Sequence, residues 1–245
     1  MKNKIIVLVG PTAVGKTDLS IKIAKRYDLE VISGDSMQIY KGMDIGTGKI
    51  TESEMEGVPH HMIDIITLEE NYSVVEFQRD VKELIEDSYR RGKIPFIVGG
   101  TGFYIQALLY EFNFDKNNEA DTEIKYDALI LGLNEDRQKL YNDINFRIEE
   151  MFSEGLLEEV KNLLNTYNFG LTASGGIGYK EFFPYFEGEI SLQQVKENVQ
   201  KNARNYAKRQ FTYFRNKLPI TWIDKNENTK EVVFDQIDAF LDKNI

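Results

Sequence analysis

The sequence contains no cysteine among its 245 residues and only two histidines, His60 and His61. Without cysteine, disulfides, thiolate catalysis and cysteine-ligated zinc sites are excluded. Neighbouring side chains in an extended segment point in opposite directions, so we do not expect the two adjacent histidines to share a metal ion. We predict that one histidine is structural and that the other faces the surface.

Long hydrophobic runs are also missing from the chain. The apolar run near the amino terminus, Ile5–Val9, is too short to cross a membrane and leads into a glycine-containing loop. With 42% hydrophobic and 29% charged residues, the composition is that of an ordinary globular protein. We therefore expect a soluble, cytoplasmic protein without a membrane partner, and we take it to be a monomer.

Positive charge is scarce, because 30 lysines and arginines face 40 acidic residues and the net charge is −10. Taken alone, this balance argues against a general nucleic-acid binder. Charge is distributed unevenly, however, and the stretch 201–217 contains cations but no acidic residue. Its cations are Lys201, Arg204, Lys208, Arg209, Arg215 and Lys217. The average over the whole chain therefore does not exclude a nucleic-acid partner.

Five apolar runs are continuous rather than alternating, as expected for strands that are covered on both faces. They are Ile5–Gly10, Glu30–Ser33, Ile94–Val98, Ala128–Leu133 and Ile220–Ile223. Helical patterns separate them, and the capping-box pairs Ser73 with Glu76 and Ser191 with Gln194 predict two helix starts. The other predicted helices are 135–152, 156–167 and one that begins after Asn228. This alternation predicts an α/β protein with a parallel sheet flanked by helices, in a single domain over residues 1–245.

A phosphate-loop pattern, G-x-x-x-x-G-K-[ST], is matched without a mismatch at residues 10–17. The segment consists of Gly10, Pro11, Thr12, Ala13, Val14, Gly15, Lys16 and Thr17. A predicted strand precedes it and a helical pattern over 18–27 follows, as the motif requires. Backbone N–H groups and the helix N-terminus would face phosphate oxygens, Lys16 would add a positive charge, and Thr17 is placed to ligate Mg²⁺. We predict that these eight residues bind a diphosphate or a nucleotide.

The position of the nearby acidic residue differs from that in most ATP-hydrolysing enzymes. Those enzymes usually hold Mg²⁺ with an aspartate that follows a second apolar strand. Here the strand 94–98 leads into Gly99-Gly100-Thr101-Gly102, whereas Asp35 follows the strand before it. Because ligands bind beyond the carboxyl ends of parallel strands, we expect Lys16, Asp35 and Thr101 in one crevice. Asp35 would act there as a base or orient a metal, and the alternative is a turn aspartate with a purely backbone role.

Eight segments then follow one another in a characteristic order. They are the phosphate loop, Ser33–Tyr40, Met43–Thr47, Val58–Asp64, Val98–Tyr104, Ile144–Ile148, Ile177–Glu181 and Ala207–Gln210. In this order they resemble the tRNA dimethylallyltransferase (isopentenyltransferase) family, and the resemblance extends from Gly10 to about Arg215. The series is much more specific than the phosphate loop alone.

The resemblance implies transfer of a dimethylallyl group from dimethylallyl diphosphate to N6 of the adenine 3′-adjacent to the anticodon in tRNA. It implies that Asp35 is the catalytic base, while Lys16 and Arg147, together with Mg²⁺, stabilise the leaving diphosphate. Thr101 would contact the tRNA near the reacting centre. The residues implied in tRNA binding are Asp35, Ser36, Met37, Gln38, Thr101, Lys208 and Arg209. For Arg147, the alternative from the residues alone is a surface ion pair with Glu149 or Glu150.

The chain departs from the family pattern in two places. The family's helical insertion is expected near 111–126, where the anticodon arm would be gripped, but the sequence has only a short polar stretch there. Gly48 stands where the family usually has alanine, which we take to be a small change. Two other activities stay open: isopentenyl transfer to free adenine nucleotides, and a small-molecule kinase, although no arginine-rich lid is evident. A binding module without catalysis would leave Asp35 unexplained.

Overall fold

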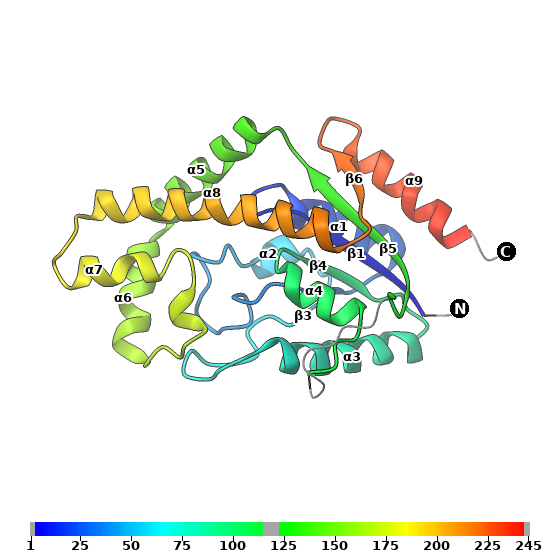
Figure 1. Ribbon diagram of the computed structural model, residues 1–245, viewed down its shortest axis with the longest axis horizontal. Coiled ribbons are helices and arrows are strands. Elements are labelled where there is room, and N and C mark those ends of the chain that lie inside the picture. Colours follow the sequence, from blue (N-terminus) through cyan, green and yellow to red (C-terminus); the bar gives the residue numbers. More distant parts are fainter. Residues whose placement is uncertain (1–2, 115–122, 243–245) are drawn as a thin grey trace.

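The computed structural model describes residues 3–114 and 123–242, and these contain a six-stranded parallel sheet in the order β3-β2-β4-β1-β5-β6. The strands are β1 (Lys4–Val9), β2 (Val31–Ser33), β3 (His60–His61), β4 (Phe96–Gly99), β5 (Asp127–Asn134) and β6 (Thr221–Asp224). Helices lie on both faces of the sheet, with α8 crossing in front of it and α1 behind it in Figure 1. The α/β class with a parallel sheet is therefore confirmed.

Strand β1 is the centre of the core. Its residues from Ile5 to Val9 are fully buried between β4 and β5. Burial of each such side chain stabilises the fold by about 1.5–3 kcal/mol, which explains the uninterrupted apolar run. The phosphate loop therefore follows directly from the fully buried centre of the sheet.

The helices are α1 (Lys16–Tyr27), α2 (Glu52–Met55), α3 (Val74–Arg90), α4 (Gly102–Leu109), α5 (Arg137–Glu154), α6 (Leu156–Thr166), α7 (Phe183–Phe186), α8 (Leu192–Lys217) and α9 (Thr229–Asp242). The helices that we predicted begin close to the expected positions, whereas the short helices α2 and α7 were not predicted. Both predicted capping boxes are present, at Ser73 before α3 and at Ser191 before α8. Gly155, with φ of 107°, separates α5 from α6 as expected.

The two histidines form the edge strand β3, which we did not predict. His60 Nδ1 lies 2.8 Å from the Val58 carbonyl oxygen, and His61 Nε2 lies 2.9 Å from the Glu30 carboxylate. Both histidines are half-buried, so the expectation that one of them faces the surface is wrong. The physical reason is the parallel pairing of β3 with β2, which brings Glu30 close enough to engage His61. Burial lowers the pKa of His60.

The segment between α4 and β5 is short. Part of the predicted insertion point, residues 115–122, lies outside the described residues, so the expectation of an absent insertion stays a prediction there. Over 3–114 and 123–242, no helix is both long enough and apolar enough to cross a membrane.

Candidate functional site

The phosphate loop joins the buried end of β1 to the first turn of α1. Gly15 has φ of 89°, a conformation that glycine adopts without the strain that a side chain would introduce. Lys16 Nζ donates to the carbonyl oxygens of Gly10, at 3.0 Å, and Pro11, at 2.7 Å. The ammonium group is thus folded into its own loop, where the N-terminus of a twelve-residue helix also favours an anion.

Burial lowers the pKa of Lys16 to about 8; the charge of Asp35 opposes this shift and that of Arg147 adds to it. The three charged groups therefore interact with one another, although they come from α1, the loop after β2 and α5. Two of them are cations near one carboxylate, so the cluster has an excess of positive charge. Such a cluster suits a multiply charged anion such as diphosphate.

Asp35 follows β2, and its carboxylate makes two kinds of interaction. Oδ1 accepts the backbone N–H of Met37 at 2.8 Å, so the turn role that we considered as the alternative is present. The same carboxylate interacts electrostatically with Lys16 and Arg147. One carboxylate oxygen thus stabilises the local turn, while the negative charge of the group acts on Lys16 and Arg147 in the crevice.

Thr101 follows β4 and contacts the segment that carries Asp35. Its Oγ1 accepts the backbone N–H of Ser36 at 3.1 Å, and its own N–H donates to the Gly34 carbonyl at 3.2 Å. A Cβ atom on Gly99 would lie 2.4 Å from the Gly34 carbonyl oxygen, so the two strand ends approach as closely as backbones allow. The predicted meeting of Lys16, Asp35 and Thr101 at one edge of the sheet is confirmed.

Arg147 lies on α5 and points to the loop after β2. Its Nη2 donates to the Gly48 carbonyl at 3.1 Å. Burial lowers the pKa of Arg147, and the charge of Asp35 opposes that effect. Glu149 instead pairs with Lys196 of α8, and in the described part of the chain Arg147 has no ion-pair partner within 4.0 Å. A surface ion pair with Glu149 or Glu150 is therefore not its role.

Gly48 makes room for this arginine. It has φ of 56°, and a Cβ atom on it would lie 1.7 Å from Arg147 Nη2. With alanine at this position, the end of the guanidinium would have to move and the backbone would be strained. Our expectation that the glycine is a small change is therefore wrong for this chain.

Ser36, Met37 and Gln38 continue along the same wall of the crevice. Gln38 Nε2 lies 3.5 Å from the Gly48 carbonyl, and its Oε1 accepts from Ser33 Oγ at 3.3 Å. Met37 lies against Gly176, where an added Cβ would be 2.7 Å from its methyl carbon. The segment is therefore fixed on both sides of Asp35.

Gln210 of α8 connects the phosphate loop to the Thr101 loop. Its Oε1 accepts the N–H of Thr12 at 3.0 Å, and its Nε2 donates to the Gly100 carbonyl at 3.0 Å. Our sequence analysis included Gln210 in a motif but gave it no role. The available signal was a polar residue on the helix face shared by Ala207 and Phe214, a face that is buried.

Tyr206, one turn earlier on α8, also borders the crevice. Burial raises its pKa to about 12, and the charge of Asp35 acts in the same direction. The Tyr206 hydroxyl, which also interacts with Thr101 and Gln210, therefore lies within electrostatic range of the Asp35 carboxylate. The sequence analysis gave Tyr206 no role, because its place beside the crevice depends on the packing of α8 against the sheet.

Lys208 and Arg209 are on the exposed side of α8, away from the face that carries Gln210. Arg209 lies over the ring of Tyr206, with 5.7 Å between its guanidinium carbon and the ring centroid. Lys208 borders a cavity of about 290 Å³ between α5 and α8, together with Arg137, Tyr141, Phe211 and Arg215. Among the described residues, no carboxylate lies within 4.0 Å of the charged nitrogens of Lys208 or Arg209. The two residues therefore form an exposed basic surface beside the crevice.

Thr17, the predicted metal ligand, is exposed in the first turn of α1. No group of three or more histidine, aspartate or glutamate side chains suited to a metal ion occurs within 3–114 and 123–242. Mg²⁺ is usually held by one or two protein oxygens, by substrate phosphates and by water. The hydroxyl of Thr17, next to a phosphate loop, fits that mode of binding and not an all-protein cage.

Comparisons with known proteins identify the family of the chain. The family model described as IPP transferase matches residues 38–125 and 113–217. A tRNA dimethylallyltransferase of Macrococcus caseolyticus is 42% identical over 299 residues, covering 97% of this chain and 96% of the relative. The crystal structure of a tRNA delta(2)-isopentenylpyrophosphate transferase from Staphylococcus epidermidis is 35% identical, with a TM-score of 0.90, and covers 99% of this chain and 100% of that one.

A more distant structure has the same fold. It is a eukaryotic dimethylallyltransferase acting on tRNA, 26% identical, with a TM-score of 0.83, covering 95% of this chain and 77% of that one. With a family model that spans most of its length and a relative aligned almost from end to end, this chain belongs to the IPP transferase family, the tRNA dimethylallyltransferases.

Proposed function

We propose that this chain transfers a dimethylallyl group from dimethylallyl diphosphate to N6 of the adenine 3′-adjacent to the anticodon in tRNA. One observation carries the proposal: Asp35 lies close enough to Lys16 and Arg147 to shift their pKa values, at the edge of the sheet where the phosphate loop begins. A base and two cations in one crevice suit a displacement in which an anion leaves. The names of the relatives support a dimethylallyl group and tRNA, and the acceptor atom N6 is the one that the family resemblance implies.

Asp35 is the proposed base. The exocyclic amine of adenine is a weak nucleophile, so removal of its proton as the new bond forms lowers the barrier. The bond that forms joins N6 to the terminal carbon of the allyl group, and the bond that breaks joins that carbon to a diphosphate oxygen. The proton from N6 passes to the Asp35 carboxylate.

Lys16 and Arg147 are proposed to stabilise the departing diphosphate, together with the N–H groups of residues 10–17. Negative charge develops on the leaving oxygen, and fixed donors aimed at it act most strongly in the transition state. Bound Mg²⁺, held by the hydroxyl of Thr17 and by the diphosphate, would add neutralising charge. The backbone amides orient the diphosphate so that its reactive carbon faces Asp35.

The adenine is proposed to lie against Asp35, Ser36, Met37, Gln38 and Thr101. A base that is stacked within an RNA loop cannot reach this crevice, so it must first leave its stack. The buried side chain of Tyr206, whose hydroxyl interacts with Thr101 and lies within range of the Asp35 charge, would help to exclude water from the reacting atoms.

The exposed basic surface of α8 is proposed to contact the tRNA backbone. Lys208 and Arg209 have no acidic partner nearby in the described residues, so their charges are available to phosphates. Arg137 and Arg215 border the adjacent cavity and add to the same surface. Contacts of this kind position an RNA without reading its sequence.

We also propose that the chain is a single phosphate-loop domain without the helical insertion of the family. Two observations support this. The two segments that match the family model meet at 113–125, and the alignment with the Macrococcus caseolyticus protein extends over 299 residues although this chain has 245. A shorter grip on the anticodon arm would make tRNA binding weak and strongly dependent on salt.

The test is an assay with dimethylallyl diphosphate, Mg²⁺ and either unmodified tRNA or AMP as the acceptor. We expect N6-isopentenyladenosine in tRNA and the release of diphosphate. If only AMP is prenylated, the acceptor is a free nucleotide. If neither acceptor is prenylated and ATP is instead converted to ADP in the presence of small phosphate acceptors, the transferase proposal is wrong and the kinase alternative is supported.

A further inference from the structure

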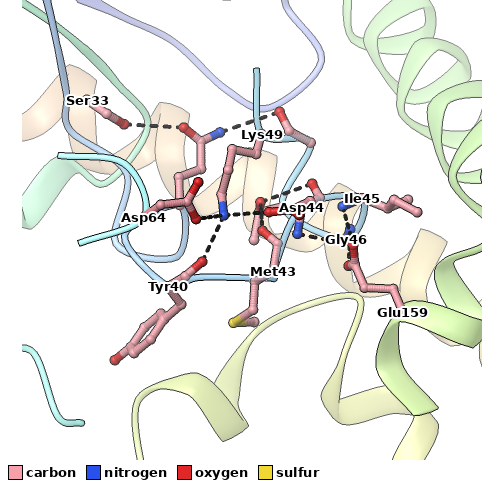
Figure 2. A network of polar contacts seen from close by, with 12 residues as sticks. Ser33, Tyr40, Met43, Asp44, Ile45, Gly46, Lys49, Asp64 and Glu159 are labelled. Atoms are coloured by element: carbon pink, nitrogen blue, oxygen red, sulfur yellow. Dashed lines mark hydrogen bonds and ion pairs between the residues drawn. The ribbon is translucent and has the colours of Figure 1, made fainter. Parts of the chain in front are cut away.

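The loop Asp44–Gly48, which follows β2 and the Asp35 turn, is held by one carboxylate from α6. Glu159 accepts three consecutive backbone N–H groups, those of Asp44 at 3.2 Å, Ile45 at 2.7 Å and Gly46 at 3.1 Å (Figure 2). Hydrogen bonds to an ionised acceptor are roughly twice as strong as those between neutral groups. Three successive N–H groups that converge on one carboxylate fix the backbone of the whole loop.

Tyr179 contacts both the loop and Glu159. Its hydroxyl donates to Glu159 Oε1 at 2.6 Å, and its ring is fully buried. Burial and the charge of Glu159 both raise the pKa of Tyr179, so it acts as a donor at any physiological pH. A Cβ atom on Gly46 would lie 2.5 Å from the ring, so the loop packs directly on the tyrosine.

Lys49 fastens the other end of the loop. Its side chain is only 5% exposed, and its ammonium group donates to the Tyr40 carbonyl and lies in ion pairs with Asp44 and Asp64. The loop is therefore held on one side by Glu159 and on the other by Lys49, as Figure 2 shows. A segment with so many polar contacts and no helical or strand structure is held in a single conformation by these side chains.

The loop contacts Arg147 through the carbonyl oxygen of Gly48. That oxygen accepts from Arg147 Nη2 at 3.1 Å and lies 3.5 Å from Gln38 Nε2. Since Gly48 has no Cβ, the guanidinium can lie directly against the backbone. The position of Gly48 thus determines where the guanidinium of Arg147 lies relative to Lys16 and Asp35.

We infer that Glu159 is a positioning residue for the transfer reaction, acting through the loop and the Gly48 carbonyl on Arg147. The inference rests on the proposed function, in which Arg147 stabilises the departing diphosphate. Glu159 does not belong to the charged cluster around Lys16: its contacts are with the backbone N–H groups of the loop and with the Tyr179 hydroxyl. Its effect on the reaction should therefore disappear when Arg147 is absent.

The first experiment compares Glu159→Gln with Glu158→Gln in the full chain. The glutamine keeps the shape of the side chain, but it is uncharged and turns an NH₂ group toward backbone N–H groups. Glu158 is the exposed neighbour on the same helix, which makes it the matched control. We expect Glu159→Gln to lower kcat about tenfold, with a smaller change in the KM for dimethylallyl diphosphate, because charge stabilisation is lost mainly in the transition state. Glu158→Gln should leave both constants unchanged.

The second experiment separates positioning from a merely structural role. In an Arg147→Ala background, Glu159→Gln should change kcat by less than about twofold, since the group through which it acts is missing. If the two losses multiply instead, Glu159 does not act through Arg147 and the inference is wrong. Should Glu159→Gln fail to fold, Tyr179→Phe provides the same test, because it removes one hydrogen bond to Glu159 and leaves the carboxylate in place.

Amide hydrogen exchange gives a readout that does not depend on catalysis. The amides of Asp44, Ile45 and Gly46 should exchange slowly in the wild type and faster in Glu159→Gln, while Glu158→Gln resembles the wild type. A wild-type protein that prenylates no acceptor contradicts the proposed function. A wild type that is active, together with a Glu159→Gln variant of equal kcat or of unchanged exchange at these amides, contradicts the positioning role alone.

Discussion

The two walls of the crevice are built in different ways. The phosphate loop consists of eight consecutive residues, and Lys16 bonds to carbonyls only five and six positions earlier. The opposite wall is assembled from four distant segments that carry Asp35, Thr101, Arg147 and Gln210. The Gln210 side chain joins residues 110 and 198 positions away, and Arg147 reaches a carbonyl 99 positions away.

This difference separates binding from chemistry. A loop whose shape comes from its own backbone can hold a diphosphate even if the rest of the site is disturbed. The opposite wall depends on the packing of α5, α6 and α8 around the end of the sheet, so small changes there alter the placement of the reacting groups. Substitutions that disturb the loop backbone should therefore mainly change donor affinity, and substitutions in the opposite wall should mainly change turnover. Lys16, which is also proposed to stabilise the departing diphosphate, should contribute to both.

The sharpest test of this separation is Asp35→Asn. The amide oxygen can still accept the N–H of Met37, so the local turn is kept while the base is lost. We expect kcat to fall about a thousandfold, within the range for loss of a general base, while donor affinity changes little. Steady-state kinetics and calorimetric titration with diphosphate measure the two effects.

The control for this prediction is Asp28→Asn at the other edge of the sheet. Asp28 is an exposed residue in a left-handed conformation that asparagine also tolerates, so this variant should behave as the wild type. If Asp35→Asn keeps the full rate, Asp35 is not the base. If it loses diphosphate binding as well, the two walls are not separable.

The kcat/KM for the donor should depend on pH through Lys16 of the phosphate loop. Burial places the pKa of Lys16 near 8, and only its protonated form attracts diphosphate. The kcat/KM for the donor, which reports the free enzyme, should be constant below about pH 8 and fall by up to about tenfold per pH unit above it. Lys16→Arg, which stays charged, should remove this decrease.

Stability should respond to the same titration in the opposite direction. The pKa of Lys16 is lower in the folded protein than its usual value of 10.5, so the unfolded chain binds this proton more tightly. The contribution of Lys16 to the free energy of unfolding therefore rises with pH between about 8 and 10.5. For the kinetic prediction, a kcat/KM for the donor that is constant up to pH 10 would contradict the burial of the Lys16 ammonium group.

The comparison also explains what could be predicted from the sequence. The phosphate loop, five of the six strands and both capping boxes follow local rules, so their positions were predicted to within about two residues. Strand β3 was missed because it has only two residues and depends on pairing with β2. The expectation of a surface-facing histidine was wrong for the same reason, since Glu30, the partner of His61, immediately precedes β2.

The opposite wall of the crevice could be predicted from the sequence only in part. Asp35 and Thr101 were predicted to meet Lys16 because parallel strands end at one edge. The contacts of Gln210, Glu159 and Gly48 join residues about 100 to 200 positions apart, and no local pattern encodes them. Only the packed structure brings such side chains together.

The smallest expected effect lies outside both walls, on the exposed basic surface of α8. Lys208→Gln and Arg209→Gln should each weaken tRNA binding a few-fold, by about fivefold at most, and reduce the slope of log affinity against log salt by about one. The control is Arg90→Gln, an exposed cation at the end of α3 with the same change in net charge. Donor affinity and turnover at saturating tRNA should stay unchanged, because neither residue belongs to the charged cluster around Asp35. Filter binding over a range of salt concentrations measures the slope, and equal slopes for Arg209→Gln and Arg90→Gln would assign the tRNA contact to another surface.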